Sequence, residues 1–189
     1  MENTEPKKAT LIIIDMQVDF ITGALANPDA ERIVDPICEL IKGWTGDIIV
    51  TMDVHGDDYL QTAEGKKLPV KHCIAGTKGE CLDSRIHAAL NSPIHVVPNE
   101  DSVYRRTRLK NTFALYWSPR MLNEDVYIVG TRTDISVISN ALVLKSACPE
   151  NNIIVYENLC AGTAPERHKA AIEVMKSCQI DILTYGGAE

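Results

Sequence analysis

Acidic residues and histidines gather in one stretch of the sequence, residues 53–72. Asp53 and His55 are two positions apart, so in an extended segment their side chains point to the same side and can converge on one ion. Glu64 and His72 follow in the same polar stretch and complete a nitrogen and oxygen ligand set for a divalent metal such as zinc, manganese or iron. A surface aspartate and loop histidines can also have this spacing by chance, so the spacing alone does not decide between a metal site and unrelated surface residues.

Asp15 and Ser136 are the other residues that suggest chemistry. Asp15 ends an apolar run, and a carboxylate at the end of a buried strand persists only beside a charged or donating partner such as a lysine. Ser136 begins a helical pattern shortly after Gly130, where backbone N–H groups favour the negative charge that develops in acyl transfer. The same positions suit a structural ion pair and a helix-capping serine, and the residues alone favour capping for Ser136.

Strand-like and helix-like stretches alternate along the chain and would position these residues. Short apolar runs predict six buried strands, at residues 10–15, 47–53, 94–97, 124–130, 152–156 and 180–183. Helical periodicity and boundary residues predict four helices, at residues 28–43, 84–90, 134–147 and 165–178. This order predicts an α/β fold with three α/β/α layers and a mostly parallel six-stranded sheet, in a single domain spanning residues 1–189. The site of such a sheet lies beyond the carboxyl ends of its strands.

Composition and charge narrow the class of protein. The 189 residues are 45% hydrophobic and 24% charged, which suits a globular chain with a buried core. A net charge of -7 argues against nucleic-acid binding, because no basic stripe is left over to neutralise phosphates. The one basic cluster, residues 105–110, is interpreted as a solvated loop. No apolar run is long enough to span a bilayer and the N-terminus lacks the pattern of a signal peptide, so we expect a cytoplasmic protein without a membrane partner.

Several segments, taken in order, resemble the isochorismatase-like hydrolase superfamily, and within it the nicotinamidase-like branch. They are residues 11–20, 51–55, 64–73, 110–113, 129–137 and 159–168. Each segment alone is a modest signal, whereas the ordered set covers nearly the whole chain. The resemblance implies an isochorismatase-like, Rossmann-like fold and hydrolysis of a carbon–nitrogen bond in a small carboxamide. It also implies a homo-oligomer, since relatives often assemble into dimers or tetramers.

Members of this superfamily use an Asp-Lys-Cys triad, and the matching positions are Asp15, Lys110 and residue 136. In those enzymes the aspartate, helped by the lysine, takes the proton of the thiol. The thiolate attacks an amide carbonyl, ammonia leaves, and water hydrolyses the thioester. The resemblance also places an oxyanion hole at the backbone N–H groups of Arg132 and Ser136, commonly beside a cis peptide bond that precedes Arg132.

A metal and a substrate-binding residue are implied by the same resemblance. The implied metal is a divalent ion, with zinc as the first choice and iron or manganese as alternatives. In nicotinamidases this metal holds the pyridine nitrogen of the substrate. Phe20 matches an aromatic residue that stacks on a flat ring. The implied metal ligands are Asp53, His55, Glu64 and His72.

The chain departs from the family pattern at two positions. Serine stands where the family has its nucleophilic cysteine, and an alcohol ionises far less readily than a thiol beside a base. A triad tuned for thiol chemistry should therefore lose most of its activity with Ser136. Arg132 stands where relatives commonly have a small residue or cysteine, and it would either narrow the pocket or bind an anionic substrate.

Three interpretations of Ser136 follow. The first is an enzyme whose cysteine was exchanged for serine to trap substrate, which the otherwise intact site favours. The second is a natural serine variant with weak or altered hydrolysis. The third is an inactive family member that binds a small ligand or a protein partner. Retention of Asp15, Lys110 and the metal ligands counts against this third interpretation, whereas Arg132 counts for it.

Overall fold

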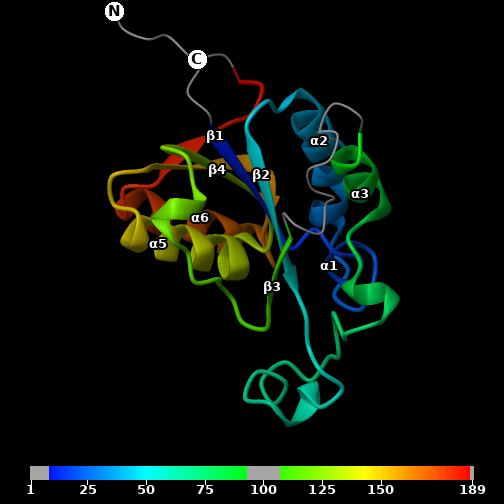
Figure 1. The fold of residues 1–189 in the computed structure, drawn as a ribbon. Helices are drawn as coiled ribbons and strands as arrows, with labels where there is room; N and C mark the ends of the chain where they lie inside the picture. The colour runs from blue at the N-terminus through cyan, green and yellow to red at the C-terminus, as the bar shows by residue number, and fades with distance from the viewer. Residues whose placement is uncertain (1–8, 93–106, 188–189) are drawn as a thin grey trace, which may run out of the picture.

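The fold is a parallel β-sheet between two layers of helices. A computed structural model describes residues 9–92 and 107–187 of the chain (Figure 1). The six strands of the sheet follow the order β3-β2-β1-β4-β5-β6, and each neighbouring pair is parallel. The predicted three-layer α/β/α fold is confirmed.

Most elements fall where the sequence predicts them. The strands are β1 (Ala9–Ile14), β2 (Asp47–Asp53), β3 (Thr107–Lys110), β4 (Asp125–Thr131), β5 (Asn152–Ala161) and β6 (Asp181–Leu183). The helices are α1 (Val18–Ile21), α2 (Pro28–Gly43), α3 (Ser84–Leu90), α5 (Ile138–Ala147) and α6 (Pro165–Ser177). Short helical turns connect them: η1 (Tyr59–Gln61), η2 (Lys78–Glu80), η3 (Pro119–Met121) and the π-helical turn η4 (Thr133–Val137).

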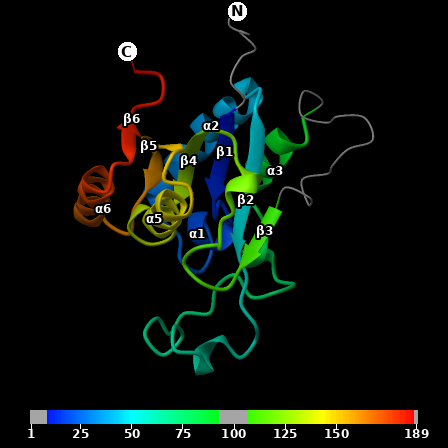
Figure 2. The same cartoon turned by 60° about the vertical axis from the view of Figure 1, so that its left-hand side comes forward.

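β1 lies in the middle of the sheet and is buried on both faces. Leu11 and Ile13 belong to the apolar cluster beneath α2 and α3, whereas Ile12 and Ile14 belong to the cluster beneath α5 and α6. Figures 1 and 2 show these two pairs of helices on opposite faces of the sheet. Because successive side chains of a strand alternate between faces, a short apolar run contributes to both halves of the core.

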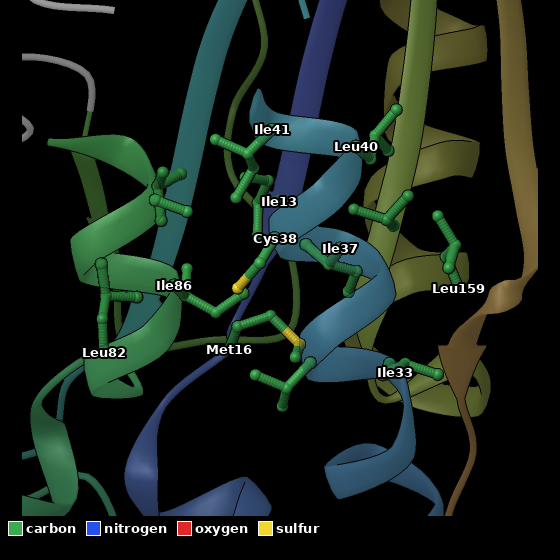
Figure 3. Packing of buried hydrophobic residues seen from close by; sticks show 14 of the residues in the cluster. Ile13, Met16, Ile33, Ile37, Cys38, Leu40, Ile41, Leu82, Ile86 and Leu159 are labelled. Carbon is green, nitrogen blue, oxygen red and sulfur yellow. The ribbon is translucent and has the colours of Figure 1, made fainter. Parts of the chain in front are cut away.

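The packing of α2 shows how the sequence specifies one of these layers. Asn27 caps the helix by accepting a hydrogen bond from the Asp29 N–H at 2.9 Å, and Pro28 occupies the first turn, where its missing N–H does no harm. The helix ends at Gly43, as predicted. Its apolar stripe packs in one cluster with residues of the sheet and α3, and Figure 3 shows Ile41 near Ile13 of β1 and Ile33 on the side of Leu159 of β5.

The interpretation of the basic run 105–110 as a solvated loop is wrong for its last four residues, and the first two lie outside the described residues. Residues 107–110 form β3, the edge strand, which pairs with β2 so that Lys110 lies beside Asp53. The side chain of Lys110 is only 2% exposed, because two carboxylates compensate its burial. The strand contains no apolar run, because two of its four residues are basic, and its pairing with β2 is non-local, so the local sequence pattern did not predict it.

Three other predictions need comment. The strand expected at residues 94–97 lies outside the described residues. The helix expected at 134–147 begins with the π-helical turn η4 and only then continues as α5. β5 continues beyond the predicted 152–156 to Ala161, with an irregular register against β4 between Ile128 and Gly130. In the described part of the chain no helix is long and apolar enough to cross a membrane.

Candidate active site

A buried ion cluster forms where the three strands β3, β2 and β1 end. Asp15 follows β1 directly, Asp53 ends β2 and Lys110 ends β3. The Lys110 Nζ atom lies 2.6 Å from Asp15 Oδ2 and 3.5 Å from Asp53 Oδ1. The Thr51 hydroxyl donates a hydrogen bond to Asp15 Oδ1 at 2.7 Å. The strand order alone therefore brings together a carboxylate and a lysine that are almost a hundred positions apart in the sequence.

The electrostatics of this cluster suit proton transfer. Burial raises the pKa of Asp15 even though Lys110 acts in the opposite direction. Burial opposes the charge of Lys110, but Asp15 and Asp53 outweigh it and raise the pKa of the lysine. Lys110 therefore keeps its proton, and Asp15 has a higher proton affinity than an exposed aspartate. A carboxylate in this state is suited to act as a general base.

A second cluster, formed by Asp53, His55 and His72, has the composition of a metal site. One ligand atom from each residue lies within 4.8 Å of the others. Asp53 Oδ2 is 3.0 Å from His55 Nε2 and 3.7 Å from His72 Nε2. The Nδ1 atom of His72 lies 2.8 Å from the Val70 carbonyl, and donation to that oxygen leaves the Nε2 lone pair directed at the cluster.

The donor set of this cluster fits a divalent cation. Two imidazoles and a carboxylate are common protein ligands for zinc, and all three side chains are buried. Asp53 Oδ1 is buried and has no hydrogen-bond donor among the described residues, only the Lys110 ammonium at 3.5 Å. Burial acts to raise the pKa of Asp53, but the adjacent imidazoles of His55 and His72, with Lys110, outweigh it and keep that pKa below its usual range. Asp53 thus stays ionised, as a ligand must.

Glu64, the fourth predicted ligand, lies outside this group of three. It is half-buried in the wall of the pocket described below. Burial opposes the charge of His72, but Asp53, the Val70 carbonyl and Glu64 together raise the pKa of that histidine. Three of the four predicted ligands are therefore in direct contact, and Glu64 is an electrostatic neighbour of the cluster.

Two residues that hold the cluster in place, Tyr59 and Gln17, were not predicted from the sequence. Tyr59 is fully buried, its ring centroid is 4.6 Å from that of His55 and 4.9 Å from that of His72, and its hydroxyl donates to the Leu68 carbonyl. Gln17 donates to the Asp53 carbonyl and accepts from the Asp53 N–H, which fixes the end of β2. These contacts join residues that are distant in the sequence. A single tyrosine in a polar loop was the only sequence signal of the role of Tyr59.

Ser136 lies in the π-helical turn η4, after β4. Gly130, near the end of β4, has a φ of +122° and lies so close to β1 that a Cβ atom would be 2.2 Å from the Ile14 carbonyl oxygen, so this position requires glycine. The peptide bond between Thr131 and Arg132 is cis, as the family resemblance implied. The helix-capping interpretation of Ser136 is wrong, because no side chain caps either η4 or α5.

Residues after β5 and one residue of α5 hold η4 in place. The Thr133 hydroxyl lies 2.9 Å from His168 Nδ1. The backbone N–H and hydroxyl of Thr163 donate to the two carboxylate oxygens of Asp134 at 2.7 and 2.5 Å. Asn140 of α5 donates to the Ser136 carbonyl at 2.8 Å. Side-chain bonds from two helices thus fix the backbone around residue 136.

A pocket of about 1280 Å³ lies between Ser136 and the histidine cluster and borders both. Its wall includes Ser136, Phe20, Arg132 and two of the three cluster residues, Asp53 and His72. The Phe20 ring centroid lies 5.6 Å from that of His72 and 5.7 Å from the Arg132 guanidinium carbon, so Phe20 contacts both. A ligand in the pocket would meet a flat ring, a hydroxyl and a cluster of metal-binding type within one space.

Known proteins share this fold, and one family model matches most of the chain. The nicotinamidase of Saccharomyces cerevisiae is 38% identical over 63 residues, a match that spans 31% of this chain and only 29% of that protein. The structure of nicotinamidase/pyrazinamidase from Bacillus subtilis superposes with a TM-score of 0.74 and 23% identity, over 93% of this chain and 98% of that one. The structure of the pyrazinamidase of Pyrococcus horikoshii in complex with zinc superposes with a TM-score of 0.68 and 23% identity, over 95% of this chain and 100% of that one. The family model of the isochorismatase domain matches residues 9–185, and the chain therefore belongs to that family.

Proposed function

We propose that this protein has the site of an amide hydrolase of the nicotinamidase type, acting on a small carboxamide. The observation that carries the proposal is the buried pair of Asp15 and Lys110, which lies beside a pocket with Ser136 in its wall. A structural ion pair has no need of a cavity, whereas acyl transfer needs a base, a nucleophile and a space for the substrate.

The proposed reaction uses these residues in two stages. Asp15 accepts the proton of the group at position 136, whose sulfur or oxygen attacks the carboxamide carbon. The backbone N–H groups of Arg132 and Ser136 stabilise the resulting oxyanion. The carbon–nitrogen bond then breaks, and Asp15 returns the proton to the departing ammonia. Water deprotonated by Asp15 hydrolyses the acyl intermediate and releases the carboxylic acid, while Lys110 keeps the charge of Asp15 compensated.

Asp53, His55 and His72 would hold a divalent metal, with Glu64 as the nearest further carboxylate. Zinc is the first choice, as in the Pyrococcus relative, and iron or manganese are the alternatives. When bound, such an ion supplies an electropositive anchor that orients a nitrogen or oxygen atom of the substrate. Phe20, in contact with His72, would then pack against the flat part of the substrate.

Serine at position 136 limits the proposed chemistry. Alcohols have a far higher pKa than thiols, so Asp15 deprotonates serine much less effectively than cysteine. We therefore expect this chain to be an impaired hydrolase, whether its serine is natural or was introduced to trap substrate. The second candidate is a member that binds a small ligand or a protein partner without turnover. Ser136 favours that candidate, and the intact ion pair and histidine cluster count against it. The homo-oligomeric state and the cytoplasmic location stay predictions.

Ammonia release from nicotinamide tests the proposal. We expect Ser136→Cys to exceed the unchanged chain by at least about 100-fold, because the thiol is the better nucleophile for this triad. Ser136→Ala should abolish the residual activity. Absence of hydrolysis by Ser136→Cys for every carboxamide tried would favour the binding candidate. A turnover of about 1 s⁻¹ or more by the unchanged chain would contradict its expected impairment.

A further inference from the structure

The side chain of Arg132 is held in the pocket wall. Its guanidinium donates a hydrogen bond to the Leu25 carbonyl and lies over the Phe20 ring, with 5.7 Å between the guanidinium carbon and the ring centroid. Both partners also line the pocket. These two contacts fix the cation in the pocket whose wall also includes Ser136, whereas an unrestrained arginine would extend into solvent.

This cation has no carboxylate as an ion-pair partner among residues 9–92 and 107–187. Asp134 is the acid that acts on it electrostatically, but both oxygens of Asp134 accept hydrogen bonds from Thr163. Burial lowers the pKa of Arg132, and Asp134 offsets this only in part. An arginine nevertheless stays charged at neutral pH, and several of its N–H donors are left for another acceptor. A half-buried charge without a counterion favours binding of an anion.

Among the described residues, the pocket wall holds both acidic and basic side chains: Asp53, Glu64, Asp134, Lys67, Arg132 and Arg167. Arg167 of α6 also lines the pocket and donates to Thr163, the residue that binds Asp134. Two acids of the pocket wall, Asp53 and Glu64, act electrostatically on His72. Arg132 and Arg167 therefore offer an anionic group two basic side chains in the pocket wall, separate from the residues that would hold the metal.

We propose that the substrate or ligand of this pocket carries a carboxylate in addition to its carboxamide, and that Arg132 binds this carboxylate. The inference rests on the proposed function and specifies its substrate class: half-amides of dicarboxylic acids. The guanidinium can bind a carboxylate through two parallel N–H donors, which also fixes the orientation of the ligand. Arg132 is then a specificity-determining residue through its side chain and an oxyanion-hole residue through its backbone.

Calorimetric titration of the unchanged chain with two matched pairs of compounds tests this inference. The pairs are succinamate with succinamide, and 3-carbamoylbenzoate with benzene-1,3-dicarboxamide. In each pair only the charged carboxylate is replaced by a neutral amide. We expect the acid of at least one pair to bind about 10- to 100-fold more tightly than its neutral partner, as for a charge-assisted hydrogen bond. Equal affinity within both pairs would overturn the inference.

Variants identify the group responsible for that preference. Arg132→Met should reduce it to within about threefold, and Arg132→Lys should retain part of it. Arg120→Met is the matched control, because it removes the same charge from an exposed position in η3 and should keep the full preference. Unchanged circular dichroism and melting temperature establish that each variant is folded. A preference that survives Arg132→Met in a folded protein would contradict the assignment.

The outcomes separate this inference from the proposed function. Hydrolysis of neutral amides by Ser136→Cys, without any preference for the acids, would overturn the inference alone. Arg132-dependent binding of the acids without hydrolysis by Ser136→Cys would support the anion site and overturn the proposed hydrolase function. If no amide binds and none is hydrolysed, both are wrong.

Discussion

Lys110 and Asp15 form a buried ion pair of 2.6 Å although their strands, β3 and β1, are not neighbours in the sheet. β2 lies between them, and its last residue, Asp53, is 3.5 Å from the same lysine. Lys110 therefore joins the proposed base to the proposed metal ligands. The ends of three adjacent parallel strands produce this arrangement, which is the usual location of a site in such sheets.

Loss of Lys110 should affect both stability and catalysis. Lys110→Met leaves Asp15 as an uncompensated buried charge, so we expect the free energy of unfolding to fall by about 3–5 kcal/mol in a urea titration. In the Ser136→Cys background it should also abolish most of the ammonia release. Lys42→Met is the control, because Lys42 forms only an exposed pair with Glu39 and its loss should change little.

A double variant separates lost attraction from uncompensated charge. Lys110→Met with Asp15→Leu removes both members of the pair, and we expect it to recover most of the stability but none of the activity. If Lys110→Met alone is as stable as the unchanged chain, the buried ion pair is not the feature that the structure indicates.

Metal content should depend on the histidine cluster. We expect about one equivalent of zinc, iron or manganese per chain by elemental analysis after purification, and a value near zero for His72→Ala. His87→Ala is the control, since His87 is exposed on α3. Chelation should lower the melting temperature of the unchanged chain but not that of His72→Ala, because a bound ion stabilises the folded state by mass action.

Glu64→Gln tests the fourth predicted ligand. We expect a smaller loss of metal affinity than for His72→Ala, because the Glu64 carboxylate acts on the cluster without belonging to the group of three. Full metal content in His72→Ala, or none in a metal-supplemented preparation of the unchanged chain, would contradict the metal site.

The turn before Ser136 should tolerate no side chain at Gly130. A Cβ atom at that position would lie 2.2 Å from the Ile14 carbonyl, and the φ of +122° disfavours alanine independently. We expect Gly130→Ala to lower the free energy of unfolding by at least about 2 kcal/mol. Gly43→Ala is a matched control, since nothing lies within 4 Å of its added Cβ, and it should be neutral or slightly stabilising. Equal effects of the two changes in denaturant titrations would show that the close approach of β4 to β1 is absent.

The stability of the protein should depend on pH through Asp83. This carboxylate caps α3 by accepting from the Arg85 N–H at 2.9 Å and pairs with the Arg85 guanidinium. Burial acts to raise its pKa, but the hydrogen bonds from Arg85 outweigh burial and lower it. The unfolded chain then binds the proton more tightly than the folded one. The stabilisation by Asp83 is therefore present above about pH 4 and is lost as the pH falls through the lowered pKa.

A pH series of urea titrations measures this contribution. Asp83→Asn should cost about 1 kcal/mol at pH 7, and its difference from the unchanged chain should shrink below about pH 4. A difference that stays constant down to pH 2 would mean that the ionised form of Asp83 contributes nothing.

Much of the fold was predictable because it depends on local patterns. The β-branched runs that became β1 and β2 are buried on both faces, and the stripe of α2 repeats with the helical period. β3 was missed because its four residues include two basic side chains and because it forms through a non-local pairing with β2. The burial of Lys110 depends on carboxylates that are remote in the sequence.

The site was predictable to a similar extent. Asp53 and His55 were found from their spacing along a strand, and the contact of His72 with them agrees with that prediction. The role of Tyr59 behind the histidines, and the link of Thr133 to His168, depend on contacts between distant segments that no single pattern records. Only the folded geometry could show that Arg132 lies over Phe20 and that no carboxylate in the described part of the chain forms an ion pair with it.

The most direct test of the central claim is intact-mass spectrometry with peptide mapping after Ser136→Cys is mixed with 4-nitrophenyl nicotinate. If residue 136 is the nucleophile and Asp15 its base, a transient nicotinoyl adduct should form on the thiol at position 136. The adduct should form much more slowly on the unchanged chain, and it should be absent when Asp15→Asn is added to the Ser136→Cys chain. Acylation elsewhere in the chain, or acylation at position 136 that Asp15→Asn does not slow, would contradict the proposed catalytic site.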